Sequence, residues 1–319
     1  EAGIVVFNSP GANAEAVKEQ VICAMVMASR DVLGSIEWVK SISDRGDEIP
    51  GLVEKGKSNF AGPELLGKSL GVIGLGATGA LVANAALDLG MVVYGFDPFM
   101  SVNAAWRLSR DVIHSDTIDD IFANSDYISL NVPYTESTHH LLNAEAFQKM
   151  RQGVRIVNES RAEVVDDEAM TEALKSGKVG KYVTDFPNNK ILQGKNVVAI
   201  PHLGASTPES EENCAVMAAQ ELREYLENGN IRNSVNLPTL EQAWSGISRL
   251  CVIHRNTPGV IASITGLLSK DNVNVENMTN KSKKDYAYTI VDLGSRVKDS
   301  LADEVRAIEG VLRVRLLNH

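Results

Sequence analysis

Short apolar runs alternate with stretches of helical periodicity between Gly67 and Pro201. Six runs rich in β-branched residues predict strands, at residues 70–73, 92–96, 127–131, 154–158, 182–184 and 197–200. Four stretches between them predict helices, at residues 77–89, 117–123, 144–150 and 166–176. Strands that alternate with helices are typical of a parallel sheet covered on both faces. The pattern therefore predicts an α/β domain built on a doubly wound parallel sheet.

The segments that flank this region predict further elements. Residues 13–33 predict one long helix, because apolar residues recur there near helical spacing. Residues 208–227 predict another, and the apolar residues 3–7 predict a strand without upstream partners. The sequence opens with Glu1 rather than a methionine, which leaves open whether this is the natural start. Residues 227–244 contain Asn-Gly-Asn and Asn-Leu-Pro and few aliphatic residues, a composition typical of a linker.

After this linker the order of elements changes. Residues 249–253 predict a strand, 258–269 a helix, 273–278 and 286–293 two strands, 300–308 a helix and 311–316 a last strand. The order βαββαβ is the ferredoxin-like arrangement. We therefore expect a second folding unit at the C-terminal end.

Composition narrows the classes of function. Of 319 residues, 44% are hydrophobic and 23% are charged, as in soluble globular proteins. The net charge of −10 argues against a nucleic-acid partner, which would need a basic surface. The three cysteines lack Cys-x-x-Cys spacing, which argues for a reducing compartment and against a metal site. No membrane or targeting segment is visible, so we expect a cytoplasmic protein that does not bind membranes.

A glycine-rich turn carries the first chemical signal. Gly74-Leu-Gly76-Ala77-Thr78-Gly79 follows a predicted strand and opens a predicted helix, and Asp97 ends the next strand. This is the spacing of a Rossmann-type dinucleotide site, in which the glycines admit the pyrophosphate and the carboxylate binds the adenosine ribose. A carboxylate there would repel a 2′-phosphate, so the sequence favours NAD over NADP. The alternative is a glycine turn in an α/β protein that binds no nucleotide.

Polar residues follow several of the predicted strands. Arg161, Asp185 and His202 each come shortly after a strand, and in doubly wound sheets ligands lie beyond the carboxyl ends of the strands. Arg161 can bind a carboxylate through its guanidinium fork, and His202 has a pKa range suited to proton transfer. Together with a nicotinamide, these groups suit the oxidation of a 2-hydroxy acid. The alternatives are an ion pair within the loop for Arg161 and a capping role for His202.

These motifs resemble the D-2-hydroxyacid dehydrogenase family, and most closely its bacterial members that oxidise D-3-phosphoglycerate in the first committed step of serine biosynthesis. The matching segments are residues 5–13, Gly74–Gly79 with Asp97-Pro98-Phe99, residues 131–138, Asn158-Glu-Ser-Arg161 with Val165-Asp166, residues 183–189, and Pro201-His-Leu-Gly-Ala-Ser-Thr207. They cover nearly the whole chain in order.

The resemblance implies a set of site residues. It makes Arg161 the clamp for the substrate and His202 the acid and base. It places NAD against Gly74, Gly76, Ala77, Thr78, Gly79, Asp97, Val132, Pro133, Glu159, Ser160, Arg161, Asp185, His202, Gly204 and Ala205. The C-terminal unit resembles an ACT domain, an amino-acid-sensing module, in which His254, Asn256 and Asn274 would hold serine; dimerisation alone is the alternative role. The resemblance also implies a homodimer or homotetramer.

The resemblance divides the chain into five parts. They are a remnant strand of the substrate domain (1–7), an NAD-binding Rossmann domain (8–206), a helix returning to the substrate domain (207–235), a linker (236–246) and an ACT-like regulatory domain (247–319). The N-terminal half of the family's substrate domain has no counterpart.

Two residues also depart from the family pattern. The glutamate that pairs with the catalytic histidine would fall near Asn189, where no carboxylate stands, and the glycine after the catalytic arginine is Ala162. An amide can orient a histidine but cannot stabilise imidazolium by charge. Two alternatives therefore stay open, a non-catalytic NAD-binding sensor of the corepressor kind and a dehydrogenase for another acid such as glycerate or lactate.

Overall fold

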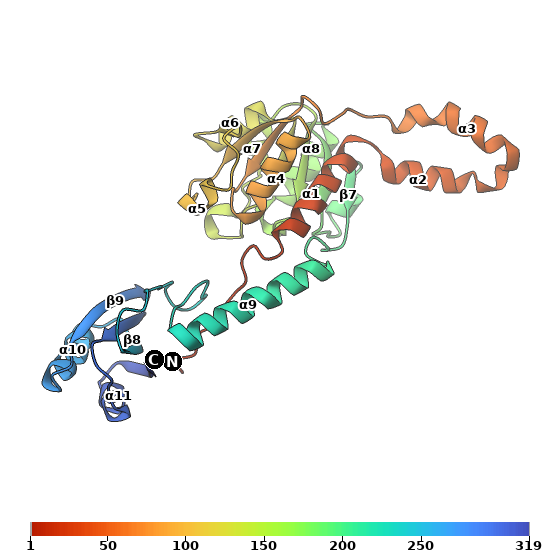
Figure 1. The fold of residues 1–319 in the computed structure, drawn as a ribbon. Helices are drawn as coiled ribbons and strands as arrows, with labels where there is room; N and C mark the ends of the chain where they lie inside the picture. The colour runs from red at the N-terminus through yellow and green to blue at the C-terminus, as the bar shows by residue number, and fades with distance from the viewer. Residues whose placement is uncertain (1, 319) are drawn as a thin grey trace. The chain divides into compact units, whose positions relative to one another are not determined.

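A computed structural model describes residues 2–318 of the chain (Figure 1), so the predicted domain ends at residues 1 and 319 lie outside the described residues. The chain forms two compact units. One runs from Asn13 to Glu211, and the other combines the segment that ends at Ala12 with everything from Glu212 onward.

The first unit is built on a parallel sheet, as predicted. Its strands are β1 Ser69–Ile73, β2 Val92–Phe96, β3 Ile113–His114, β4 Tyr127–Leu130, β5 Val154–Asn158, β6 Val179–Thr184 and β7 Val197–Ala199. They pair in the order β3-β2-β1-β4-β5-β6-β7, and every pair is parallel. The chain leaves β1 toward one edge and returns to β4 on its other side, which makes the sheet doubly wound. The short β3 was not predicted.

Helices cover both faces of this sheet. Helices α6 Ile118–Asn124, α7 Ala144–Lys149 and α8 Asp167–Lys175 contribute Phe122, Phe147 and Met170 to one buried cluster. Helices α1 Ala14–Ser29 and α4 Ala77–Asp88 contribute to a second cluster, which includes Met25 and Val82. The single turn α5 Val102–Ala105 follows β2. The two-sided burial explains why the strands are continuous apolar runs.

The helix predicted over residues 13–33 is confirmed as α1 only up to Ser29, because the chain breaks at Arg30. Arg30 is extended, and the Asp31 side chain caps a new helix, α2 Val32–Ser41, by accepting a hydrogen bond from the Gly34 amide. Short turns at Ser43–Glu48 and Lys57–Phe60 flank α3 Ile49–Gly56. No residue of these four elements is buried, and Figure 1 shows them extending from the sheet as an arm, defined here as residues 32–60.

The C-terminal unit has the predicted βαββαβ order. Its elements are β8 Ser248–Arg255, α10 Val260–Lys270, β9 Val275–Lys283, β10 Tyr286–Leu293, α11 Asp299–Arg306 and β11 Val311–Asn318. The strands pair in the antiparallel order β11-β8-β10-β9. Both helices pack on one face, around Ile264 and Val305. The other face holds a smaller cluster, in which Leu237 and Leu240 of the predicted linker are buried.

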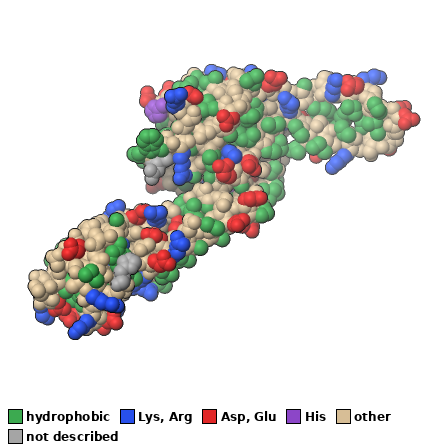
Figure 2. Space-filling view, in the orientation of Figure 1, with side chains coloured by type: hydrophobic (Ala, Val, Ile, Leu, Met, Phe, Trp, Pro, Cys, Tyr) green, Lys and Arg blue, Asp and Glu red, His purple; other side chains and the backbone are tan. Residues whose placement is uncertain are grey.

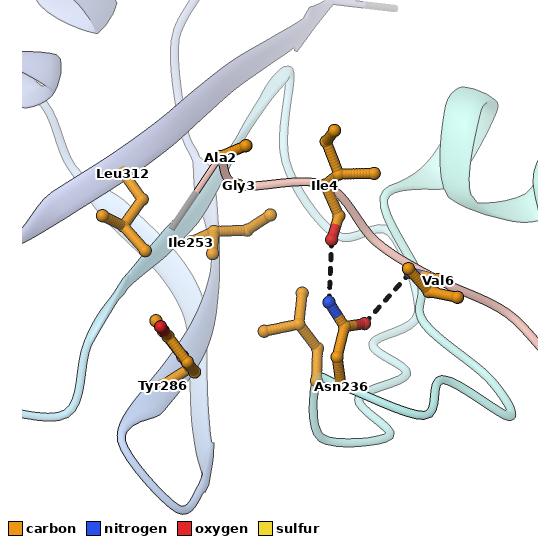
Figure 3. Close-up of a pocket in the computed structure, with 9 residues that line it drawn as sticks. Ala2, Gly3, Ile4, Val6, Asn236, Ile253, Tyr286 and Leu312 are labelled. Atoms are coloured by element: carbon orange, nitrogen blue, oxygen red, sulfur yellow. Dashed lines mark hydrogen bonds between the residues drawn. The ribbon is translucent and has the colours of Figure 1, made fainter.

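The strand predicted at residues 3–7 does not form. Only Phe7 makes a ladder contact, an isolated bridge to Ser234. The segment is held instead by Asn236, whose Nδ2 donates to the Ile4 carbonyl (2.8 Å) and whose Oδ1 accepts from the Val6 amide (3.0 Å), as Figure 3 shows. A side-chain amide here satisfies backbone groups that a neighbouring strand would otherwise pair. Helix α9 Pro208–Asn228 leads from the parallel-sheet unit toward Asn236.

Within residues 2–318, no helix is long and apolar enough to cross a membrane.

Candidate functional site

The three glycines of the turn after β1 differ in what surrounds them. A Cβ on Gly74 would lie 2.6 Å from the Asn131 carbonyl oxygen, and its φ of +88° already favours glycine. A Cβ on Gly79 would lie 1.9 Å from the Gly74 carbonyl oxygen. A Cβ on Gly76 would meet nothing within 4 Å. Packing therefore requires the first and third glycines, whereas the second faces open space at the N-terminus of α4, where a phosphate would bind.

Asp97 is fixed beside this turn. Its Oδ2 accepts a hydrogen bond from the Leu75 amide (2.8 Å) and its Oδ1 from the Phe99 amide (2.9 Å). A cavity of about 610 Å³ adjoins it. The predicted residues Gly74, Gly76, Asp97, Val132 and Pro133 all line this cavity.

The sequence had not assigned the rest of this lining to the cofactor, although Pro98, Phe99 and residues 131–138 lie in the segments that match the family. It comprises Ile73, Phe96, Pro98, Phe99, Ile118, Asn131, Thr135, Ser137, Thr138 and Leu141. The Thr138 hydroxyl donates to the Pro133 carbonyl (2.7 Å), and Thr135 caps the short turn at Glu136–Thr138. The spacing Thr135-x-x-Thr138, an N-cap signature after a strand, is the signal that could have indicated this side of the cavity.

The loop after β5 carries Ser160 and Arg161, and Asn158 holds it in place. The buried Asn158 side chain accepts hydrogen bonds from the amide and the hydroxyl of Ser160 and donates to the Arg161 carbonyl (3.0 Å). The Arg161 guanidinium donates to the Ser160 carbonyl and stays exposed. This loop leaves most of the guanidinium donors free for a ligand.

Asp185 and His202 meet at the carboxyl ends of β6 and β7. Asp185 Oδ2 lies 4.0 Å from His202 Nε2, with 1% of the Asp185 side chain and 60% of the His202 side chain exposed. The His202 ring packs at 4.8 Å from the Phe186 ring. Asn189, where the family pattern places a glutamate, is exposed. The carboxylate nearest to His202 in the described chain is therefore Asp185.

Glu159 lies buried at the same edge. Neither of its carboxyl oxygens has a hydrogen-bond partner among the described residues, and the same holds for Asp185 Oδ1. Burial, and then the charge of Asp185, raise the pKa of Glu159 to about 8. Burial also raises the pKa of Asp185, while the positive charges of His202 and Arg161 oppose that rise.

The remaining predicted cofactor residues lie in two segments, one that follows β1 and one that follows β7. Ala77 and Thr78 open α4, and Gly204 and Ala205 belong to the turn after His202. A Cβ on Gly204 would lie 3.9 Å from Asp185 Oδ2. The structure thus gathers Arg161, Asp185 and His202 at one edge of the sheet.

The structure does not gather the three predicted effector residues in the C-terminal unit. His254 is buried, with Nδ1 at 2.8 Å from the Arg255 carbonyl and Nε2 at 2.9 Å from the Thr289 hydroxyl. The Asn256 side-chain amide donates a hydrogen bond to the Lys284 carbonyl, in the turn just before β10. The Asn274 carbonyl accepts from Gly294, just past the end of β10. Strand β10, which has eight residues and is about 25 Å long, lies between these two contacts. Asn256 and Asn274 of one chain therefore do not meet in one site.

A second pocket, of about 310 Å³, lies between the N-terminal segment and the C-terminal sheet (Figure 3). Ile4, Val6, Ile253 and Leu312 give it an apolar lining, and the Asn236 side chain is occupied by the backbone. Among the described residues that line it, Tyr286 is the one with a titratable side chain.

Comparisons with known proteins agree with this geometry. Residues 22–204 match the family model described as the NAD binding domain of D-isomer specific 2-hydroxyacid dehydrogenase. A D-3-phosphoglycerate dehydrogenase of Archaeoglobus fulgidus is 37% identical over 248 residues, which are 76% of this chain and 44% of that protein. One of Synechocystis sp. is 30% identical over 98% of this chain and 60% of its own length. The chain thus spans about half the length of these curated relatives.

A solved structure supports the same assignment. The D-mandelate dehydrogenase of Rhodotorula graminis superposes with a TM-score of 0.63 and 25% identity, covering 76% of this chain and 71% of that one. The family model covers more than half of the chain, including the glycine turn, Asp97, Arg161, Asp185 and His202. The chain therefore belongs to the D-isomer specific 2-hydroxyacid dehydrogenases.

Proposed function

We propose that this protein binds NAD and oxidises a D-2-hydroxy acid, with D-3-phosphoglycerate as its substrate. The names of the curated relatives support the substrate. The open space at Gly76, the cavity beside Asp97 and the helix terminus at α4 fit the pyrophosphate and adenosine of NAD. The fixed Asp97 carboxylate favours NAD over a cofactor with a 2′-phosphate.

The side chains at the sheet edge have complementary roles in this proposal. Arg161 binds the substrate carboxylate through its guanidinium fork and polarises C2. His202 accepts the proton of the C2 hydroxyl in the oxidation and returns it in the reverse reaction. Asp185 faces His202 and stabilises the imidazolium by charge. NAD, when bound, accepts the hydrogen that leaves C2 with its electron pair.

The observation that carries the proposal is the convergence of Arg161, Asp185 and His202 at the carboxyl ends of β5, β6 and β7, in the same parallel sheet whose strand β1 leads into the glycine turn. We expect NAD-dependent formation of NADH, followed by absorbance, from D-3-phosphoglycerate and much less from glycerate or lactate. His202→Ala is expected to lower kcat by about 10²–10⁴-fold and to leave the Kd for NADH nearly unchanged. His114→Ala is the matched control, because His114 is exposed on the edge strand β3. Wild-type turnover in His202→Ala would refute the assigned role.

A non-catalytic NAD-binding sensor is the second candidate. The exposed Asn189, which supplies no charge to His202, favours it. A chain that binds NADH and forms no NADH from any 2-hydroxy acid would support the sensor.

We further propose that the C-terminal unit is an ACT-like module and that the chain forms homo-oligomers. The βαββαβ order supports the first point. The exposed apolar residues of the arm support the second. A serine site that used both Asn256 and Asn274 would draw them from different copies of the chain. Calorimetry with serine tests this, and no heat across a panel of amino acids would leave only dimerisation for this unit.

A further inference from the structure

Two carboxylic acids occupy equivalent positions on neighbouring strands of the parallel sheet. Asn158 of β5 and Thr184 of β6 are register partners, and each is followed directly by an acid, Glu159 and Asp185. Neighbouring parallel strands lie about 4.8 Å apart. Glu159 is 8% exposed and Asp185 2% exposed. The sheet thus places two acidic groups side by side, away from solvent.

Three of their four carboxyl oxygens are unpartnered. Both Glu159 oxygens and Asp185 Oδ1 are buried without a hydrogen bond among the described residues. Two unpaired carboxylates in a buried site cannot both stay ionised, because each raises the cost of charging the other. One of the two therefore keeps a proton near neutral pH.

The surroundings decide which acid keeps it. Asp185 faces His202 at 4.0 Å and experiences the positive charge of Arg161, and both favour its ionised form. Asp185 is the charged group that acts on Glu159, and its charge, together with burial, favours the neutral form of Glu159. The nearby Tyr182 hydroxyl, which accepts a hydrogen bond from Asn158, stays neutral because burial raises the pKa of its phenol to about 12. The proton therefore belongs on Glu159.

We propose that Glu159 is a positioning residue, whose neutral carboxyl allows Asp185 to carry the one negative charge that faces His202, in place of a carboxylate at Asn189. This inference rests on the proposed function, because it concerns the proton on His202. It adds a second ionisable group, the buried Glu159, to the site.

The proposal predicts a change near pH 8. When Glu159 loses its proton there, a second negative charge develops beside the reacting groups. This charge favours the cationic nicotinamide of NAD⁺ over the neutral ring of NADH. We expect the ratio of the Kd for NADH to the Kd for NAD⁺ to rise by about tenfold between pH 7 and pH 9.5.

Glu159→Gln tests this directly, because glutamine mimics the neutral acid. In this variant the ratio of dissociation constants is expected to stay flat across the same pH range. Glu163→Gln, at an exposed glutamate in the same loop, is the matched control and is expected to titrate like wild type. Asp185→Asn removes the negative charge that faces His202 and is expected to lower kcat.

The readouts separate this inference from the proposed function. Fluorescence titration gives both dissociation constants without turnover, so a chain that binds NAD but catalyses nothing still decides the role of Glu159. A wild-type ratio that does not change between pH 7 and pH 9.5 would overturn the inference, and it needs no variant to fold. A wild-type change that persists in Glu159→Gln would overturn it as well. Failure to bind either form of NAD would overturn both proposals.

Discussion

Gly76 and Gly79 stand three residues apart, yet a side chain at each would have different consequences. The Cβ of Gly79→Ala would lie 1.9 Å from a backbone oxygen that cannot move without shifting the turn. We expect this substitution to destabilise the unit by about 3 kcal/mol. Gly76→Ala has open space and a negative φ, so its stability is expected to match wild type.

NADH binding separates the two glycine variants further. A methyl group on Gly76 would keep phosphate from the amides at the start of α4, and we expect about tenfold weaker NADH binding, equivalent to one hydrogen bond to a charged group. Thermal unfolding and NADH titration of both variants check this pair of expectations. Equal loss of stability in both would contradict the difference in packing.

Arg249 and Asp292 form a buried ion pair in the C-terminal sheet. Arg249 Nε lies 2.6 Å from Asp292 Oδ1, both side chains are fully buried, and Gln242 and Ser245 also donate to Asp292. Removing one partner leaves the other charge buried and unpaired, which costs about 3–5 kcal/mol. Arg249→Met is therefore expected to destabilise this unit by that amount, as measured by urea unfolding.

The same pair predicts a pH dependence. Burial would raise the pKa of Asp292, but hydrogen bonds from Arg249, Gln242 and Ser245 outweigh it and hold the pKa below its usual range. A lowered folded-state pKa stabilises the fold above the unfolded pKa of about 3.9, and this contribution is lost as the pH falls through the folded value.

The difference in unfolding free energy between wild type and Asp292→Asn should therefore be largest near pH 7 and should shrink below pH 4. Asp285→Asn, at an exposed position of the same unit, is expected to show no such trend. A difference that stays constant down to pH 2 would mean that the charge of Asp292 is not responsible.

Among the elements, the arm presents a partly exposed apolar face on α2. Val32, Leu33, Ile36 and Val39 lie on one side of α2 and are 37–46% exposed. Figure 2 shows hydrophobic side chains along this part of the molecule. Burying this face against a second copy would remove it from water.

We expect Ile36→Glu to dissociate the proposed homo-oligomer in sedimentation experiments, because a charge in the middle of an apolar contact opposes its burial. Ser41→Glu adds the same charge on the opposite side of α2 and is expected to leave the oligomer intact. Identical sedimentation of wild type and Ile36→Glu would exclude this face as the interface.

The arm also shows where sequence patterns stop being sufficient. Strands β5 and β10 form over the predicted residues, because a strand buried on both faces needs an unbroken apolar run. The break at Arg30 was missed because the apolar pattern continues into Val32 and Leu33, while the decisive contact is the Asp31 cap. Residues 3–7 had strand composition but obtained their partner from Asn236, which is distant in sequence.

In the candidate site, too, the sequence predicted the features that depend on local patterns and missed one that depends on a distant contact. The glycine turn and Asp97 were predictable, because their spacing alone fixes a local conformation. The position of Asp185 beside His202 followed from strand order. The burial of Glu159 beside Asp185 depends on the register between β5 and β6, which residue spacing within either strand does not contain.

At the scale of the whole molecule, the two units have separate hydrophobic cores. One pair of clusters belongs to the parallel sheet and the other pair to the C-terminal sheet. Separate cores can unfold in separate steps, so a single unfolding temperature need not describe the chain. We expect two transitions in calorimetry.

A ligand and a substitution should each move only one of these transitions. NADH at about 100 times its Kd stabilises the unit that binds it by about 2.7 kcal/mol, so it is expected to raise the transition of the parallel-sheet unit alone. Arg249→Met is expected to lower the other transition, and NADH should still raise the first one in this variant. If both transitions moved together in either experiment, the two units would be thermodynamically coupled, and a signal at the C-terminal sheet could then reach the NAD site through that coupling.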